Sequence, residues 1–180
     1  MKTYGALFRG INITGRNLLP MKELVSLLEA LGCRNVRTYI QSGNAVFRSD
    51  ERDATPLARR IVAEIQKRRG FNPRVLLLGV DELEKAITGN PFPDAESEPG
   101  KLHVGFLVAV PPDPDLNKLE ALRSRGERFA LKGTVFYLHT PEGYGKSKLA
   151  ASAERLLGVP MTDRNWRTVC KIREMVKELK

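Results

Sequence analysis

The sequence predicts an α+β fold made of two βαββαβ-type subdomains that arose by duplication, each with an antiparallel sheet and helices packed on one face. Apolar strands and amphipathic helices alternate in the same order in both halves of the chain. A stretch rich in Pro and acidic residues, 90–100, separates the halves and has no core periodicity. The 180 residues, of which 42% are hydrophobic, suffice to bury the cores of two small subdomains.

The first half contains every element of one copy. Its apolar or alternating stretches are typical of strands, and the turn Ser42-Gly43-Asn44 joins two of them as a hairpin. Its helices show apolar residues at helical spacing and stop at Gly32 and Gly70. The predicted strands cover residues 3–9, 36–41, 45–48 and 74–80, and the predicted helices cover residues 20–31, 55–69 and 82–88.

The second half repeats this order but ends differently. Where the last strand is expected, only the short segment 159–162 occurs, and a closing helix with Trp166 on its apolar face follows directly. The other predicted elements are strands over residues 102–110, 128–131 and 135–139 and helices over residues 116–122 and 149–157.

The strand and helix order is that of a ferredoxin-like fold, so we expect two ferredoxin-like subdomains. The predicted N-terminal subdomain covers residues 1–89, a linker covers residues 90–100, and the C-terminal subdomain with its closing helix covers residues 101–180.

Composition excludes several classes of protein. No segment approaches the roughly 20 apolar residues of a membrane helix, and Arg9 interrupts the N-terminus before a signal-peptide core. We therefore expect a cytoplasmic protein without membrane contact. Cys33 and Cys170 are isolated, which argues against a disulfide framework or a zinc site. The net charge of +9 favours anionic partners, either a small molecule or nucleic acid.

Polar residues gather in the connection between the first strand and the first helix. Residues 8–17 include two arginines, two asparagines and two glycines, which together expose donors and allow close approach of a ligand. In a ferredoxin-like unit the hairpin tip lies at the same sheet edge as the end of the first strand. We therefore expect one site for a phosphate, carboxylate or nucleic-acid backbone. Its predicted ligand-binding residues are Arg9, Asn12, Arg16, Asn17, Gln41, Ser42 and Asn44.

An alternative interpretation assigns these residues to turn structure. The asparagines would then bond to their own turns, and the glycines would only supply positive φ angles. Arg9 would form a salt bridge, with Asp50 as a candidate partner. The sequence leaves both interpretations open.

The second half adds four candidate ligand-binding residues: Lys146, Lys148, Arg164 and Asn165. The segment Gly145-Lys146-Ser147 is similar to part of a P-loop, but Thr140 stands where that motif requires glycine, and Ser147 as a helix N-cap explains the segment more simply. His103 and His139 have no Cys or acidic residue at metal-ligand spacing. We expect no metal and no cofactor, and no catalytic residue is assigned.

Several motifs together resemble the bacterial family called domain of unknown function 1697. They are Leu7-Phe8-Arg9-Gly10-Ile11-Asn12, Pro20-Met21, residues 38–44 (TYIQSGN), Asn90-Pro91-Phe92, Ser147-Lys148-Leu149, and Thr162 with residues 164–169 (RNWRTV). The resemblance spans nearly the whole chain and implies two related ferredoxin-like subdomains. It implies no activity. The chain has Ile13-Thr14 where the family has a double glycine, which argues against a fixed glycine-rich phosphate cradle.

These observations predict a protein that binds an anionic, phosphate-bearing or nucleic-acid ligand at the loop cluster. One alternative is a metal-independent, phosphatase-like enzyme acting on small phosphorylated substrates, in which an arginine holds the phosphate and Gln41 or Asn44 orients water. A second alternative is a protein-interaction module, which an apolar surface patch would favour. Ligand identity and oligomeric state do not follow from the sequence.

Overall fold

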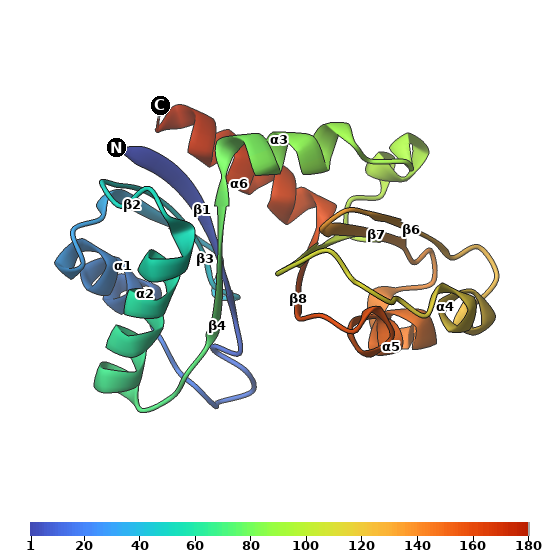
Figure 1. The fold of residues 1–180 in the computed structure, drawn as a ribbon, viewed down its shortest axis with the longest axis horizontal. Coiled ribbons are helices and arrows are strands. Elements are labelled where there is room, and N and C mark those ends of the chain that lie inside the picture. Colours follow the sequence, from blue (N-terminus) through green and yellow to red (C-terminus); the bar gives the residue numbers. More distant parts are fainter. Residues whose placement is uncertain (180) are drawn as a thin grey trace. The chain divides into compact units, whose positions relative to one another are not determined.

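The computed structural model describes residues 1–179, which form two four-stranded antiparallel sheets with helices (Figure 1). The strand orders β2-β3-β1-β4 and β6-β7-β5-β8 are the same, so the βαββαβ order occurs twice and the predicted fold class is confirmed. The elements of the first copy are β1 (Lys2–Arg9), α1 (Met21–Ala30), β2 (Arg34–Tyr39), β3 (Asn44–Ser49), α2 (Ala54–Arg69), β4 (Arg74–Gly79) and α3 (Val80–Thr88). Those of the second are η1 (Pro93–Ser97), β5 (Leu102–Leu107), α4 (Leu116–Leu122), β6 (Arg128–Lys132), β7 (Val135–His139), η2 (Tyr144–Lys146), α5 (Lys148–Leu157), β8 (Met161–Asn165) and α6 (Trp166–Glu178).

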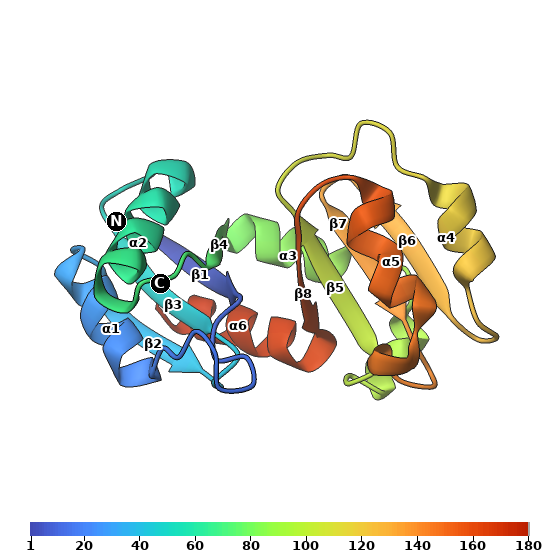
Figure 2. The ribbon, with the colours of Figure 1, turned by 90° about the horizontal axis from the view of Figure 1, so that it is seen from below.

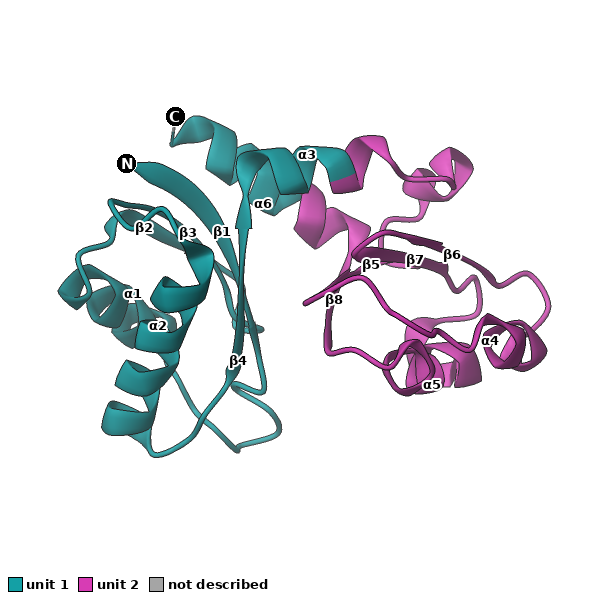
Figure 3. Ribbon diagram, in the orientation of Figure 1, with its two compact units in different colours: residues 1–85, 171–180 teal, residues 86–170 magenta. Residues whose placement is uncertain are grey.

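The chain divides into two compact units whose boundaries fall inside helices α3 and α6 (Figure 3). Unit 1 comprises residues 1–85 and 171–180, and unit 2 comprises residues 86–170. This division differs from the predicted one, because the expected linker 90–100 belongs to unit 2 and the end of the closing helix belongs to unit 1. No local sequence pattern predicts that residues 90–100 belong to unit 2 or that the end of the closing helix belongs to unit 1.

In unit 1 the sheet has helices on both faces, which corrects the prediction of helices on one face only. Helices α1 and α2 cover the face that carries Tyr4, Ala6 and Phe8, and Leu24 and Ile61 join these residues in one buried core. Gly5 points to the opposite face, where a Cβ atom on it would lie 2.9 Å from Ile172 of α6 and 3.1 Å from Leu83 of α3. The absence of a side chain at residue 5 therefore lets a second helical layer approach this sheet.

In unit 2, α4 and α5 pack on one face of the sheet (Figure 2). Leu119 of α4 and Leu149 of α5 share a buried core with Phe136 and Leu138 of β7. On the opposite face the Tyr137 hydroxyl donates a hydrogen bond of 2.6 Å to the carbonyl oxygen of Ala86. Lys132 Nζ donates to the carbonyl of Gly89, and Arg128 forms an ion pair with Asp94. Residues 86–100 thus cover this face by binding to the strands.

The second copy is complete, which corrects the prediction that it lacks a last strand. Residues 161–165 form β8, which pairs antiparallel with β5, and α6 begins only at Trp166. The residues of β8 are mostly polar and show no apolar alternation. The Asn165 carboxamide oxygen accepts a hydrogen bond from the backbone N–H of Thr168, so Asn165 caps α6.

Side-chain caps also begin three other α-helices. Asp115 caps α4, and Ser147 caps α5 as predicted; each accepts a hydrogen bond from the backbone N–H three residues later. Asp53 caps α2, because its carboxylate accepts a hydrogen bond from the Thr55 N–H.

Among residues 1–179 no helix combines the length and apolar character needed to cross a bilayer. The same residues contain no group of three or more His, Cys, Asp or Glu side chains that could hold a metal ion. Within residues 1–179 neither Cys33 nor Cys170 forms a disulfide, and burial raises the pKa of Cys33 to about 11, so that its thiol stays protonated at neutral pH.

Candidate functional site

The β1–α1 loop and the β2–β3 turn lie at one edge of the first sheet. Leu7 is paired with Asn44, and the Phe8 N–H donates a hydrogen bond of 2.8 Å to the carbonyl oxygen of Gly43. We call residues 10–20 and 40–43 together the two-loop platform. It forms where the topology predicted, because β3 runs antiparallel between β1 and β2.

The side chain of Asn12 holds the platform together. Its amide nitrogen donates to the carbonyl oxygens of Gln41 at 2.9 Å and of Leu19 at 3.0 Å, and its oxygen accepts from the Leu19 N–H at 2.8 Å. One side chain thereby joins the beginning of the β1–α1 loop to its end and to the β2–β3 turn. Because all these bonds go to backbone groups of the platform, Asn12 acts as a structural link.

Residues 13–16 form a tight turn inside the β1–α1 loop. The backbone groups of Ile13 and Arg16 exchange two hydrogen bonds of 3.0 and 2.7 Å, and the turn residues Thr14 and Gly15 have φ angles of 43° and 77°. These angles are those of a type I′ turn. Asn17 closes the loop next to it by donating from its amide to the carbonyl of Gly10 at 2.9 Å. The turn-structure interpretation thus accounts for the Asn17 side chain as well.

Left-handed backbone conformations are concentrated in the platform. Thr14 and Ile40 have φ angles of 43° and 50°, which are unusual for β-branched residues and store local strain. Gly43 has a φ of 89°, and a Cβ atom there would lie 2.6 Å from Ile11 Cδ1. The platform residues with positive φ are Gly10, Asn12, Thr14, Gly15, Asn17, Ile40 and Gly43.

Asn44 lies beneath the β2–β3 turn. Its side chain is completely buried, and its amide nitrogen donates to the carbonyl of Tyr39 at 3.0 Å and to the hydroxyl oxygen of Ser42 at 3.2 Å. The amide therefore orders the turn from inside and does not present its donors at the surface. Of the residues predicted here, Arg9, Arg16, Asn17, Gln41 and Ser42 are exposed.

The surroundings of the platform carry positive charge without acidic residues. Residues 3–22, 38–49 and 70–80 include Arg9, Arg16, Lys22, Arg48 and Arg74 but no Asp or Glu. The first carboxylate after the loop, Glu23, is bound to Arg69, which lowers its pKa. Asp50, the partner suggested for Arg9, lies beside Arg34 instead, at 3.9 Å. A shallow depression of about 500 Å³ beside the platform is lined by Arg9, Gly10, Asn72, Pro73 and Arg74.

The platform also exposes apolar side chains that the sequence analysis did not select. Ile13, Leu18 and Ile40 are 52%, 55% and 50% exposed. Ile13 directly follows Asn12, whereas Leu18 and Ile40 directly precede the two residues, Leu19 and Gln41, whose backbones are bonded to the Asn12 side chain. The three apolar residues are therefore grouped around Asn12. The sequence did contain a signal for these exposed side chains: Ile and Leu occur in loops rich in Gly and Asn, outside the periodicity of any helix or strand.

The candidate residues of the second half lie in unit 2, at the edge of the sheet where β5 begins. Lys146 ends η2 and Lys148 begins α5, and both are exposed. Arg164 and Asn165 lie at the end of β8 and not in a helix, which corrects their predicted setting. Arg164 donates to the carbonyl of Asp163 at 2.8 Å, and the Asn165 side chain caps α6.

Unit 2 contains a polar cluster around His103 that the sequence analysis missed. His103 Nδ1 lies 2.9 Å from the Asp163 carboxylate, and its Nε2 lies 3.2 Å from the carbonyl oxygen of Gly100. The ring stacks on Tyr144 with centroids 4.2 Å apart. Residues 103 and 163 are far apart in sequence, and only the pairing of β5 with β8 brings them together.

A second histidine cluster lies on the opposite face of this sheet. Arg128 donates two hydrogen bonds to Asp94 and one of 3.1 Å to His139 Nδ1. Burial and the Arg128 charge lower the pKa of His139, while Arg128 also lowers the pKa of Asp94. The other ring nitrogen, Nε2, is buried and has no hydrogen-bond partner within residues 1–179. The neutral imidazole is therefore favoured here, with Nδ1 accepting from Arg128.

Comparison with known proteins supports the architecture. The family model described as "Protein of unknown function (DUF1697)" matches residues 1–137. The chain is also similar to a solved structure, that of the conserved bacterial protein SP0830 from Streptococcus pneumoniae, with 27% identity, a TM-score of 0.74, and coverage of 97% of this chain and 98% of that chain. No curated protein matches the chain significantly. The similarity covers both units and therefore extends to the whole duplicated fold.

Proposed function

The chain belongs to the family described as "Protein of unknown function (DUF1697)", and we propose that it binds a phosphate group of an anionic ligand at the two-loop platform. The ligand is either a small phosphorylated molecule or a nucleic-acid backbone, which present the same group. Arg16 and Gln41 contribute exposed side-chain donors, and the turn at residues 13–16 contributes backbone donors.

The turn at residues 13–16 is the observation that carries the proposal. Thr14, Gly15 and Arg16 are exposed, and within residues 1–179 the N–H groups of Thr14 and Gly15 donate to no protein acceptor. Successive backbone N–H groups in a turn, together with a guanidinium group, suit an oxyanion. The two hydrogen bonds between Ile13 and Arg16 hold the turn in one conformation, which lowers the entropy lost on binding.

The electrostatic surroundings support the same proposal. The three chain segments that form and flank the platform carry arginines and no carboxylate, so no acidic group of these segments competes with a ligand for Arg16. Positive potential at an exposed edge also raises the association rate of anions.

Neither alternative function gains equal support. The phosphatase-like mechanism needed an amide side chain to orient water, but the amide of Asn44 is buried and bonded to Tyr39 and Ser42. The amide of Gln41, the other residue suggested to orient water, is exposed. Binding of a phosphate group through Arg16 is nevertheless the simpler function, because it requires no catalytic step. The exposed apolar side chains favour protein interaction and are considered further below.

Thermal unfolding with increasing phosphate, sulfate and nucleotide concentrations tests the proposal. A ligand at 100 times its Kd stabilises the native state by about 2.7 kcal/mol, which raises the Tm by about 5–10 °C for a chain of this size. We expect the double variant Arg16→Ala with Gln41→Ala to lose most of this shift. Arg59→Ala is the matched control, because Arg59 is an exposed arginine on α2 outside the platform.

Equal shifts in the wild type, the double variant and the control would refute the site. Retention on heparin and single-stranded RNA at graded salt concentrations then separates the two sources of phosphate. Nucleic-acid binding weakens steeply with salt, and removal of one phosphate contact lowers the salt slope by about 1. A phosphate-dependent shift without retention on either polymer identifies the ligand as a small molecule.

A further inference from the structure

Exposed large apolar side chains gather at two places. Among residues 1–179, six of the seven such residues lie either on the two-loop platform of unit 1 or in the β5–α4 connection of unit 2 and the first residue of α4. The first group is Ile13, Leu18 and Ile40, and the second is Val108, Val110 and Leu116, which are 52%, 62% and 42% exposed. We call residues 108–116 the acidic loop.

The platform and the acidic loop occupy the same position in the two copies of the fold. The N–H of Phe8, near the end of β1, donates at 2.8 Å to the carbonyl of Gly43 in the following hairpin turn. The N–H of Leu107, at the end of β5, donates at 2.8 Å to the carbonyl of Thr134 in the equivalent turn. The chain continues from these strands into the platform loop and into the acidic loop, respectively.

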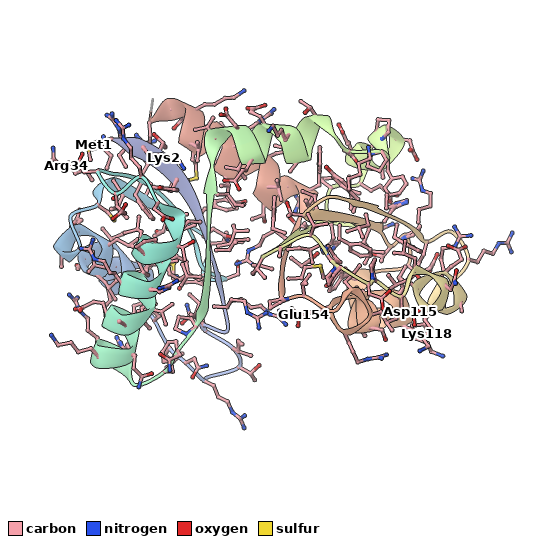
Figure 4. All side chains as sticks on the ribbon, viewed as in Figure 1. Met1, Lys2, Arg34, Asp115, Lys118 and Glu154 are labelled. Carbon is pink, nitrogen blue, oxygen red and sulfur yellow. The ribbon has the colours of Figure 1, made fainter. Side chains whose placement is uncertain are left out.

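The two surfaces carry opposite charge. Residues 10–20 contain Arg16 and no acidic residue, whereas residues 108–116 contain Asp113 and Asp115 and no basic residue. Asp115 caps α4 and lies beside Lys118 at 3.1 Å (Figure 4), which lowers its pKa. Asp113 is exposed and has no ion-pair partner within residues 1–179. A depression of about 330 Å³ lies beside it, lined by residues 113–117.

We propose that the two-loop platform of one copy of this protein binds the acidic loop of a second copy. Ile13, Leu18 and Ile40 pack against the valines and leucine of the acidic loop, and Arg16 pairs with Asp113. This rests on the proposed function in one respect, the affinity of the platform for anionic groups. The inference goes further because it identifies a carboxylate-bearing partner and adds an apolar contact.

A second copy fits better than an unrelated partner, because the chain itself carries both complementary surfaces. Each has three exposed aliphatic side chains and one exposed, oppositely charged group. Such matching gives specificity as well as attraction. The contact joins two different surfaces, so it repeats head to tail, as a ring or an open chain. Its small size places it among weak interfaces, with a Kd of about 0.1 mM.

Sedimentation velocity of the full chain, up to a concentration of about 1 mM where such a contact is largely occupied, tests the inference. We expect the average mass of the wild type to increase with concentration. Arg16→Glu and Asp113→Arg, measured separately, each place like charges across the contact and should weaken association at least about tenfold. Arg59→Glu, which alters an exposed arginine elsewhere on unit 1, should associate like the wild type.

Mixing the two charge variants provides the sharpest readout. The platform of the Arg16→Glu variant then meets the acidic loop of the Asp113→Arg variant, which restores an ion pair with its charges exchanged. The unchanged Arg16 of the second variant meets the unchanged Asp113 of the first, so the mixture should associate although neither variant does alone. Leu18→Ser and Val110→Ser, which alter exposed apolar residues, repeat the test if a charge variant fails to fold. A wild type that stays monomeric, or a mixture that stays monomeric, would overturn the inference.

The two proposals fail separately. Self-association that depends on residues 16 and 113, without any thermal shift by phosphate, would support this inference and refute the proposed function. A phosphate shift that depends on Arg16 in a protein that stays monomeric at all concentrations would do the opposite.

Discussion

The two units share one backbone plan but place their polar side chains at opposite ends of the central strand. In unit 1 the polar network lies after β1, where Asn12 binds the platform loops. In unit 2 it lies at the start of β5, where His103 contacts Asp163, Gly100 and Tyr144. At the end of β5 the chain instead continues into a loop with three prolines and two aspartates. The duplication therefore preserves strand order and hydrogen-bond register, while the chemistry of each edge differs.

The largest expected effect comes from the hairpin turns, where Gly43 and Thr134 occupy equivalent positions. Gly43→Ala places a Cβ atom 2.6 Å from Ile11 Cδ1 in a backbone with a φ of 89°. Left-handed strain and overpacking together should lower the free energy of unfolding by about 4 kcal/mol. Thr134→Ala, at an exposed position, should change it by less than about 0.5 kcal/mol. Urea denaturation of both variants measures the difference, and equal values would contradict the proposed role of Gly43.

Removing the Asn12 side chain should have the next largest effect. Asn12→Ala deletes three hydrogen bonds to the platform backbone and leaves alanine at a φ of 51°. At about 1 kcal/mol for each bond and up to about 1 kcal/mol for the left-handed conformation, the loss of stability should be about 3–4 kcal/mol. Asn17→Ala is the matched control because it deletes one bond at a φ of 52° and should cost about 1–2 kcal/mol. If both variants lose the same stability, Asn12 does not link the loops as described.

A smaller effect distinguishes the starts of the two central strands, where Tyr4 and His103 are equivalent. The Tyr4 hydroxyl donates to the carbonyl of Glu51 at 3.0 Å, so Tyr4→Phe should cost about 1 kcal/mol. Asp163→Ala removes the carboxylate partner of His103 and should cost about 2 kcal/mol, because hydrogen bonds to charged groups are stronger. Chemical denaturation at neutral pH compares them. A larger loss for Tyr4→Phe would show that the His103 cluster adds little stability.

The elements that depend on local sequence patterns could be predicted from the sequence. The apolar periodicity of α1 and α2, the hairpin around Gly43 and the Ser147 cap are local signals, and the structure confirms them. The meeting of the platform loops also followed, because strand order constrains which loops share an edge. The parts that failed depend on long-range partners. β8 was missed because its polar residues are paired through β5 and the His103 cluster, contacts that no local pattern encodes.

The candidate site was predictable in position but not in the role of each residue. An asparagine in a loop has the same sequence signature whether it binds a ligand or its own backbone. The residues differ in burial and bonding: Asn12 and Asn44 are bonded within the platform, whereas Arg16 and Gln41 are exposed. The exposed Ile40 was unpredictable because the left-handed φ of 50° that turns this residue outward is itself imposed by the hairpin.

The smallest expected effect concerns pH and a further pair of equivalent residues. Arg48 of β3 lies across from Arg34, and His139 of β7 lies across from Arg128. The position holds a histidine only in unit 2, where burial and the Arg128 charge lower the pKa of His139 below the ordinary value of 6.5. The neighbouring carboxylates Asp94 and Glu98 oppose this shift, which limits its size. Only unit 2 should therefore respond to pH through this position.

The direction of the response follows from proton linkage. Above pH 6.5 His139 is neutral in both the folded and the unfolded chain, and its full contribution to stability is present. As the pH falls below 6.5, the unfolded chain takes up the proton first, so stability declines until the folded chain also protonates. His139→Gln removes this titration. The difference in unfolding free energy between wild type and variant should therefore shrink from about pH 8 to about pH 5. Acidic groups with lowered pKa values, including Asp94, lose their contribution at lower pH and do so in both proteins. A difference that stays constant across this range would show that the contact with Arg128 does not depend on the neutral imidazole.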